Sequence, residues 1–175
     1  HESMSGSGRN FHSVQHVFDV AEGGGPLQTI AALFHDTVYY QVDGGFSPKQ
    51  AQVLKGVVHE GPEGVRLASI KAENDPLLAA VTKIFGFAAE QLLSPFAGLN
   101  EFLSAVLATR SLDGSLSMTQ LVQIAACIEA TIPFRKQDNE SESPQRLLLS
   151  RLTTVNAEFT LGLSQEQITQ TVERA

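Results

Sequence analysis

Apolar residues recur at spacings of three and four along most of the chain, which is the periodicity of amphipathic helices. The first such pattern covers residues 10–22 and predicts a helix there. A run of three glycines at 23–25 ends it, and Pro26 suits the first turn of a second helix over 26–40. The N-terminal part therefore predicts two consecutive helices.

The rest of the chain shows similar signals for the start of a helix. A Ser or Asp stands directly before a proline in three places, as an N-cap residue does before the first residue of a helix, and these predict helices over 48–60, 76–87 and 144–160. Further helices are predicted over 101–111 and 118–132, capped by Asn100 and Ser117. Ser164 and Gln167 form the capping box of a last helix.

No segment alternates convincingly between apolar and polar residues. The short run GVVHE (56–60) falls inside the predicted helix 48–60 and reads as part of it. There is no fixed-period repeat, and 175 residues suit one domain. We expect a single all-α domain over 1–175, with residues of the natural protein missing at one or both ends.

The amino-acid composition excludes some classes of function for the protein. The hydrophobic content of 42% suffices for a core, and the net charge of −7 argues against nucleic acid or an anionic membrane as partner. A small phosphate ester held by a few local cations stays compatible with it. The chain has no membrane-spanning run and no signal-peptide pattern, so we expect a cytoplasmic protein; nothing specifies its oligomeric state. Cys127, the single cysteine, is expected to be buried.

Histidines and a carboxylate carry the candidate chemistry. His12 and His16 are four residues apart and share one helix face, and His35-Asp36 interrupts an apolar run. A buried carboxylate needs partners, and a metal with histidine neighbours would supply them. Structural histidines in a core are the alternative that spacing alone leaves open.

Two segments carry a family resemblance. FHSVQHVFDV (11–20) together with IAALFHD (30–36) resembles the HD-domain metal-dependent phosphohydrolase superfamily. The first segment is also similar to the H-x-x-x-H-x-x-D-V segment of class I cyclic nucleotide phosphodiesterases. FHDTVYY (34–40) and QIAACIEATIPFR (123–135) resemble small bacterial predicted HD phosphohydrolases. The resemblance implies an HD/phosphodiesterase-like helical bundle around a divalent metal.

Carried over by residue, the resemblance makes His16, His35 and Asp36 metal ligands. Asp36 would also orient or deprotonate the attacking water, and His12 would protonate the leaving group. Asp19 matches a position of the motif; one turn beyond His16, it either accepts the second ring N–H of His16 or faces solvent. Glu129, polar in a helix expected to be buried, either supports the site or makes a polar contact in the interior.

The closing aspartate of the family has no clear match. Asp113 is one candidate, and a residue beyond Ala175 is the alternative we favour; a site without it is the third. His59 is either a further ligand or a histidine at a helix end. Arg135 and Lys136 either bind substrate phosphate or are solvated loop charges.

These features predict a metal-dependent phosphohydrolase acting on a phosphate mono- or diester, with a nucleotide among the possible substrates. Its cofactor would be a divalent ion, and His plus Asp ligands suit Fe, Mn, Mg, Zn or Ni. The alternative is a non-catalytic HD-like module that binds a nucleotide or regulates a partner, and a metal-free helical protein is a third reading. Neither a phosphate-binding G-x-x-x-x-G-K-[ST] loop nor a G-x-S-x-G elbow occurs.

Overall fold

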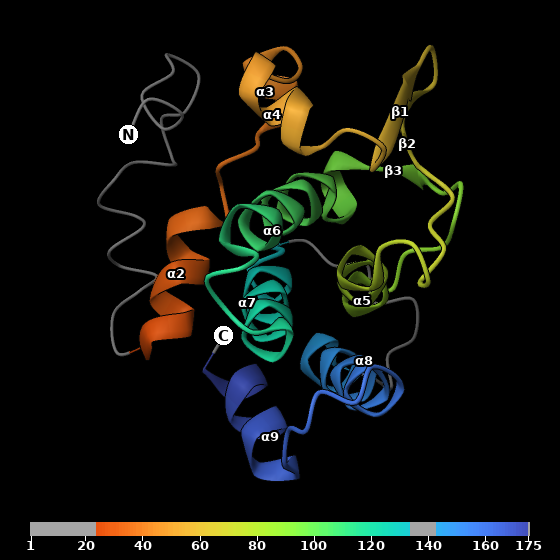
Figure 1. Ribbon diagram of the computed structural model, residues 1–175. Coiled ribbons are helices and arrows are strands. Elements are labelled where there is room, and N and C mark those ends of the chain that lie inside the picture. Colours follow the sequence, from red (N-terminus) through yellow and green to blue (C-terminus); the bar gives the residue numbers. More distant parts are fainter. Residues whose placement is uncertain (1–23, 134–142, 175) are drawn as a thin grey trace.

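Helices make up most of the structure. The computed structural model describes residues 24–133 and 143–174, so the predicted helix 10–22 lies outside the described residues. Of the described residues, 58% are helical and 8% are in strands, which confirms a mainly α class. The elements are α2 (Pro26–Phe34), α3 (Tyr40–Asp43), α4 (Pro48–Val53), β1 (Val58–Gly61), β2 (Gly64–Leu67), α5 (Pro76–Phe85), β3 (Leu92–Leu93), η2 (Pro95–Ala97), α6 (Leu99–Leu112), α7 (Met118–Ala130), α8 (Pro144–Glu158) and α9 (Gln165–Glu173) (Figure 1).

Helix α7 lies at the centre of the bundle. It contacts α2, α5, α6, α8 and α9, which surround it in Figure 1. Every residue from 124 to 129 is buried, because a helix with neighbours on all sides has no solvent face. The core therefore forms around the run IAACIE, which the sequence marked as apolar.

The predicted helix starts are largely confirmed. Ser47, Asp75 and Ser143 each accept a hydrogen bond from the backbone N–H three residues on, with proline following directly. Capping boxes, in which the serine and a glutamine three residues later bond each other's backbone, open α4, α7 and α9. The exception is α6, which begins at Leu99 after Gly98, so Asn100 is not its cap.

The prediction of one helix over 26–40 is wrong, because α2 ends at Phe34. Side chains donate hydrogen bonds to carbonyl groups at the end of the helix. His35 Nδ1 donates to Ala32 O at 2.8 Å, and the Thr37 hydroxyl donates to Phe34 O at 2.6 Å. The next backbone N–H groups bind side chains of α6 instead of α2. Tertiary hydrogen bonds thus replace the helical ones.

The prediction of one helix over 48–60 is also wrong. Helix α4 ends at Val53, and Arg110 of α6 donates from Nη1 to Val53 O at 2.5 Å. Gly56, with a φ of 76°, turns the chain into β1. The segment GVVHE therefore contributes a strand, contrary to the sequence reading.

Strands β1, β2 and β3 form a small antiparallel sheet at the edge of the bundle (Figure 1). β1 and β2 form a hairpin in which Val58 pairs with Leu67 and Gly61 with Gly64. Val65 and Leu67 point into the core while their neighbours are more exposed, the alternation of a sheet covered on one face. Pro62 and Glu63 lie between two glycines, a composition typical of turns. The prediction of a helix over 48–60 did not take this turn into account.

None of the helices in the part of the chain that the structure describes is both long enough and apolar enough to cross a bilayer.

Candidate functional site

His35 and Asp36 form a buried pair just beyond the end of α2. His35 Nε2 lies 2.8 Å from Asp36 Oδ2, and the side chains are only 5% and 8% exposed. The ring is fixed at its other nitrogen, because Nδ1 donates to Ala32 O at 2.8 Å. The Ala32 carbonyl group and the Asp36 carboxylate therefore contact the two nitrogens of the imidazole and fix its orientation.

Helix α6 holds the backbone that follows the pair. The Val38 N–H donates to Ser104 Oγ and the Tyr40 N–H donates to Asn100 Oδ1, both at 3.0 Å. Both α6 side chains are buried, and residues 100 and 104 share one helix face. On the other side, Gln50 Nε2 donates to Thr37 O at 2.9 Å. The segment from Thr37 to Tyr40 is therefore fixed from two directions.

The pair has the features of two ligands of one divalent ion. Because Nδ1–H donates to a carbonyl group, Nε2 is the nitrogen that can bind a metal, and metal-bound histidines are commonly fixed in this way. Neighbouring ligand atoms at about 2.1 Å from an octahedral ion lie about 3.0 Å apart. The Nε2–Oδ2 separation of 2.8 Å is close to that value. The pair could supply two ligands to a divalent ion, and no third His, Cys, Asp or Glu of residues 24–133 and 143–174 joins it.

Electrostatics at His35 favour positive charge there. Burial alone lowers the pKa of His35. The hydrogen bond and the negative charge of Asp36 act in the other direction, helped by the Ala32 carbonyl group and the charge of Glu101, and the net result is a raised pKa. The interactions with Asp36, the Ala32 carbonyl group and Glu101 together outweigh the cost of burying a charged imidazole.

Glu101 is the residue of this region that the sequence reading missed. It lies in the first turn of α6, between Asn100 and Ser104, and its Oε2 has almost no exposed surface. Its charge is one of those that raise the pKa of His35. The sequence did contain a sign of this residue. NEFLS (100–104) has polar residues in an otherwise apolar helix, just as His35-Asp36 lies in an otherwise apolar segment.

The structure keeps two predicted ligands away from the pair. His59 is exposed on β1, opposite Arg66 in the sheet, and not at the end of a helix as predicted. Asp113 is exposed just after α6, and its Oδ1 accepts the N–H of Gly114 at 3.0 Å, as a turn residue does. Among the described residues, neither is grouped with His35 and Asp36 closely enough to share a metal ion.

Several predicted site residues lie outside the described residues. They are His12, His16 and Asp19 of the first motif, and Arg135 and Lys136 after α7. Their roles stay predictions. Across residues 24–133 and 143–174, no three His, Cys, Asp or Glu side chains are grouped closely enough to hold a metal ion.

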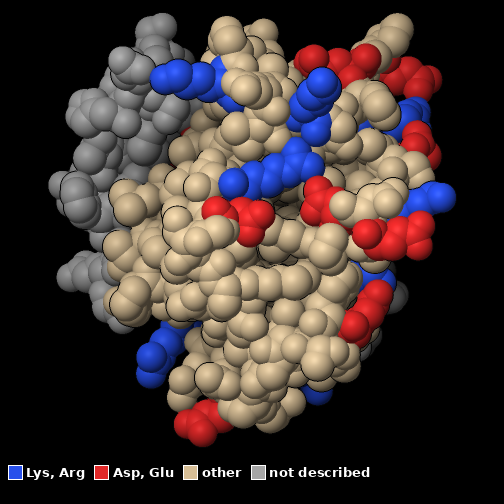
Figure 2. Space-filling view, viewed as in Figure 1, with Lys and Arg blue, Asp and Glu red and all other residues tan. Residues whose placement is uncertain are grey.

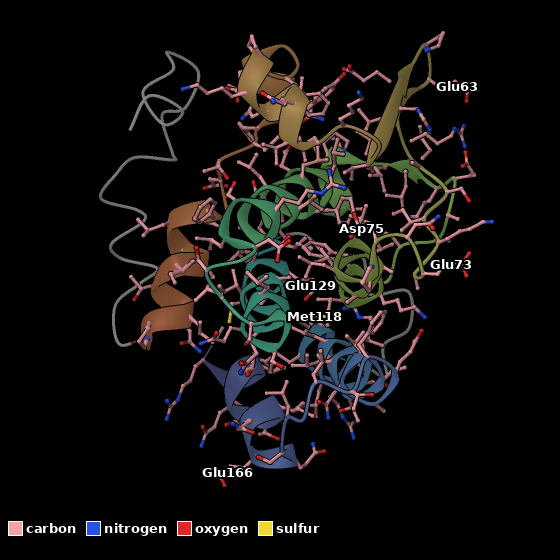
Figure 3. All side chains as sticks on the ribbon, in the orientation of Figure 1. Glu63, Glu73, Asp75, Met118, Glu129 and Glu166 are labelled. Carbon is pink, nitrogen blue, oxygen red and sulfur yellow. The ribbon has the colours of Figure 1, made fainter. Side chains whose placement is uncertain are left out.

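Glu129 makes a polar contact in the interior. Its carboxylate is 2% exposed and accepts from Arg151 Nη2 of α8 at 2.8 Å. Figure 3 shows it at the middle of the bundle, whereas Glu63, Glu73 and Glu166 point outward. This geometry corresponds to the second of its two predicted roles.

Tyr40 and Glu60 connect the segment after the site to the sheet. The Tyr40 hydroxyl donates to Glu60 Oε1 at 2.5 Å, and this hydrogen bond is the main reason that the pKa of Tyr40 is raised. The Tyr40 ring also packs against Phe46, with centroids 4.9 Å apart. Figure 2 shows acidic side chains gathered at this end of the molecule, over the β1–β2 hairpin.

No family model matches the chain, and neither a curated protein nor a solved structure matches it.

Proposed function

We propose that the protein is a metal-dependent hydrolase of phosphate esters. The buried His35–Asp36 pair carries this proposal, since its fixed imidazole and adjacent carboxylate suit one divalent ion. The motif around His12 and His16, which resembles that of HD-domain phosphohydrolases, adds the remaining histidines. A divalent ion bound there would hold a phosphoryl oxygen and make a nearby water more acidic.

The chain's own residues then have separate tasks. Asp36 orients a water molecule for attack on phosphorus, because its carboxylate accepts hydrogen bonds and is buried away from bulk solvent. His35 keeps Nε2 directed into the site through its bond to Ala32 O. By its resemblance to the motif, His12 donates a proton to the leaving oxygen.

The first test is hydrolysis of bis-(4-nitrophenyl) phosphate and 4-nitrophenyl phosphate by the full chain with Mn²⁺, Mg²⁺, Fe²⁺, Zn²⁺ or Ni²⁺. We expect turnover with at least one ion and a loss of at least about 100-fold in kcat in His35→Ala and Asp36→Asn. His59→Ala is the matched histidine control and should keep wild-type turnover, because His59 is exposed on β1.

Two results would contradict catalysis. Turnover that is equal in wild type and His35→Ala would assign it to a contaminant. Calorimetry that shows nucleotide binding without hydrolysis under any metal would favour the alternative, a non-catalytic HD-like module that binds a nucleotide or regulates a partner.

A further inference from the structure

A small cavity lies between helix α5, the end of β2 and the segments that follow these two elements. Its volume is about 180 Å³, and the described residues that line it are Leu67, Ala68, Ile70, Ala72, Ala79, Thr82, Lys83, Phe87 and Ala89. None of them is a member of the His35–Asp36 pair or of the residues that bind the backbone after it. The cavity is therefore a second candidate site, independent of the proposed hydrolase chemistry.

The bottom of the cavity is apolar. Leu67, Ala68 and Ala79 are buried there, none of them more than 7% exposed. The hydroxyl group of buried Thr82 already donates a hydrogen bond, to Leu78 O at 2.8 Å. Four of the nine lining residues are alanines, whose short side chains leave the space unfilled. Water finds few hydrogen-bond partners on such a surface, so an apolar group replaces it favourably.

Phe87 forms a fixed wall of the cavity. Its backbone N–H donates to Thr82 O at 3.1 Å, just after the end of α5. Its ring packs against Phe85 and Phe102, with centroids 5.8 and 5.3 Å apart. These contacts prevent the ring from turning inward to fill the space.

The loop on the other side, residues 68–75, is held at both of its ends. The Ala68 N–H donates to Val57 O at 2.9 Å, and the Asp75 carboxylate accepts from Arg110 Nη2 at 3.0 Å. With both walls fixed, the cavity exists before any ligand binds, which lowers the entropic cost of binding.

Lys83 gives the mouth of the cavity its charge. It is the single charged residue among the nine that line the cavity, and its side chain is 46% exposed. Its Nζ donates to Glu158 Oε2 at 2.8 Å. An ammonium group has three donors, so this bond leaves Lys83 able to donate to a second carboxylate.

We propose that this cavity binds a small carboxylate with an apolar body, of about the size of benzoate. An apolar cavity of about 150 Å³ holds one benzene molecule, so a volume of about 180 Å³ suits one ring or a short alkyl chain. The hydrocarbon part lies against Leu67, Ala68 and Ala79. The carboxylate lies at the mouth and accepts a hydrogen bond from Lys83.

Titration of the ¹⁵N-labelled full chain with sodium benzoate, followed by NMR, tests the inference. We expect a Kd on the order of 1 mM, the range for a ligand of this size, and at least about fivefold weaker binding of benzamide, which has the same shape without the charge. The largest shift changes should fall within residues 67–72 and 79–89. This location is read from wild type and does not depend on a variant.

Two pairs of variants separate the apolar and the charged contributions. Ala79→Leu fills the bottom of the cavity and should weaken benzoate binding at least about tenfold. Ala51→Leu, the same change at an exposed helical position of α4, should leave it unchanged. Lys83→Met should weaken benzoate binding about fivefold, whereas Glu158→Gln keeps the ammonium group and should bind benzoate at least as tightly as wild type.

Each contrary result overturns a stated part of the proposal. Absence of binding at about 20 mM benzoate, or shift changes outside the lining segments, would overturn the site. Equal binding by wild type and folded Ala79→Leu would do the same. Equal affinities for benzoate and benzamide would overturn the carboxylate as ligand class. Equal losses in Lys83→Met and Glu158→Gln would assign the effect to the broken ion pair instead of the ammonium group.

Discussion

At the scale of the residue, Cys127 shows how far the interior changes a functional group. Its Sγ lies 3.9 Å from the Thr171 carbonyl oxygen, between α7 and α9, and burial raises the pKa of its thiol to about 12. The thiolate is therefore almost absent at neutral pH in the folded protein, and the thiol acts as an apolar side chain.

This pKa predicts how stability responds to alkaline pH. The unfolded thiol ionises near its ordinary pKa of 9.0 while the folded one keeps its proton, so the unfolded state binds fewer protons and the free energy of unfolding falls as pH rises. Denaturant titrations of wild type and Cys127→Ala should converge by up to about 1.4 kcal/mol per pH unit above about pH 9. A constant difference between the two proteins from pH 8 to 11 would contradict it.

Single residues were predictable where their own segment determines their environment. The apolar run around Cys127 was enough to predict its burial, which is confirmed. The contact of Asn100 with Tyr40 and the effect of the Glu101 charge on His35 were missed because each joins residues 60 or more positions apart in the sequence. Local pattern shows that a polar residue lies in an apolar helix, but not which segment it meets.

At the scale of the element, helix starts were predictable and helix ends were not. The starts of α4, α5 and α8 are encoded by adjacent residues, a capping side chain and a proline. The ends of α2 and α4 depend on α6, through Ser104 and Arg110. The apolar periodicity alone therefore predicted both helices longer than they are, and the β1–β2 hairpin after α4 was not predicted.

Gly86 and Gly44 allow a controlled test of one helix end. Both follow a helix with nearly the same left-handed φ, 68° and 70°, but a Cβ at Gly86 would lie 2.7 Å from Arg151 Nη1, whereas one at Gly44 would meet nothing within 4 Å. Gly44→Ala should cost about 1 kcal/mol of backbone strain. Gly86→Ala should cost at least about 1 kcal/mol more, because Arg151 must move away from Glu129. Equal losses in urea titrations would show that Arg151 moves freely.

At the scale of the whole molecule, two ion pairs join α8 to the rest of the bundle. Arg151 pairs with buried Glu129 of α7, and Lys83 of α5 pairs with Glu158, both at 2.8 Å. The second pair is exposed, with side chains 46% and 42% accessible, whereas Glu129 is 2% accessible. The same distance should therefore correspond to different energies.

Removing the cation from each pair measures that difference. Arg151→Met should lower the free energy of unfolding by about 2–3 kcal/mol, because it removes a cation from a buried carboxylate. Lys83→Met should lower it by less than about 1 kcal/mol, since water screens and solvates the exposed pair. Chemical denaturation of both variants at low and high salt checks this, and only the Lys83 contribution should weaken with salt. Equal losses would contradict the assigned role of burial.

The architecture as a whole was predictable only in outline. The mainly helical class follows from the periodicity, and it is confirmed. The HD-type arrangement stays a prediction that rests on the two motifs, because the first motif lies outside the described residues. The packing of α2, α6 and α7 against one another depends on long-range contacts that no short segment encodes.

The capping boxes have a consequence for the protein in acid. All three complete the box with glutamine, at positions 50, 120 and 167. An amide has no proton to gain as the pH falls, so these helix starts keep their hydrogen bonds under conditions in which a glutamate in the same place would be neutralised. Acid should therefore leave the starts of α4, α7 and α9 wound while interactions that depend on carboxylates weaken.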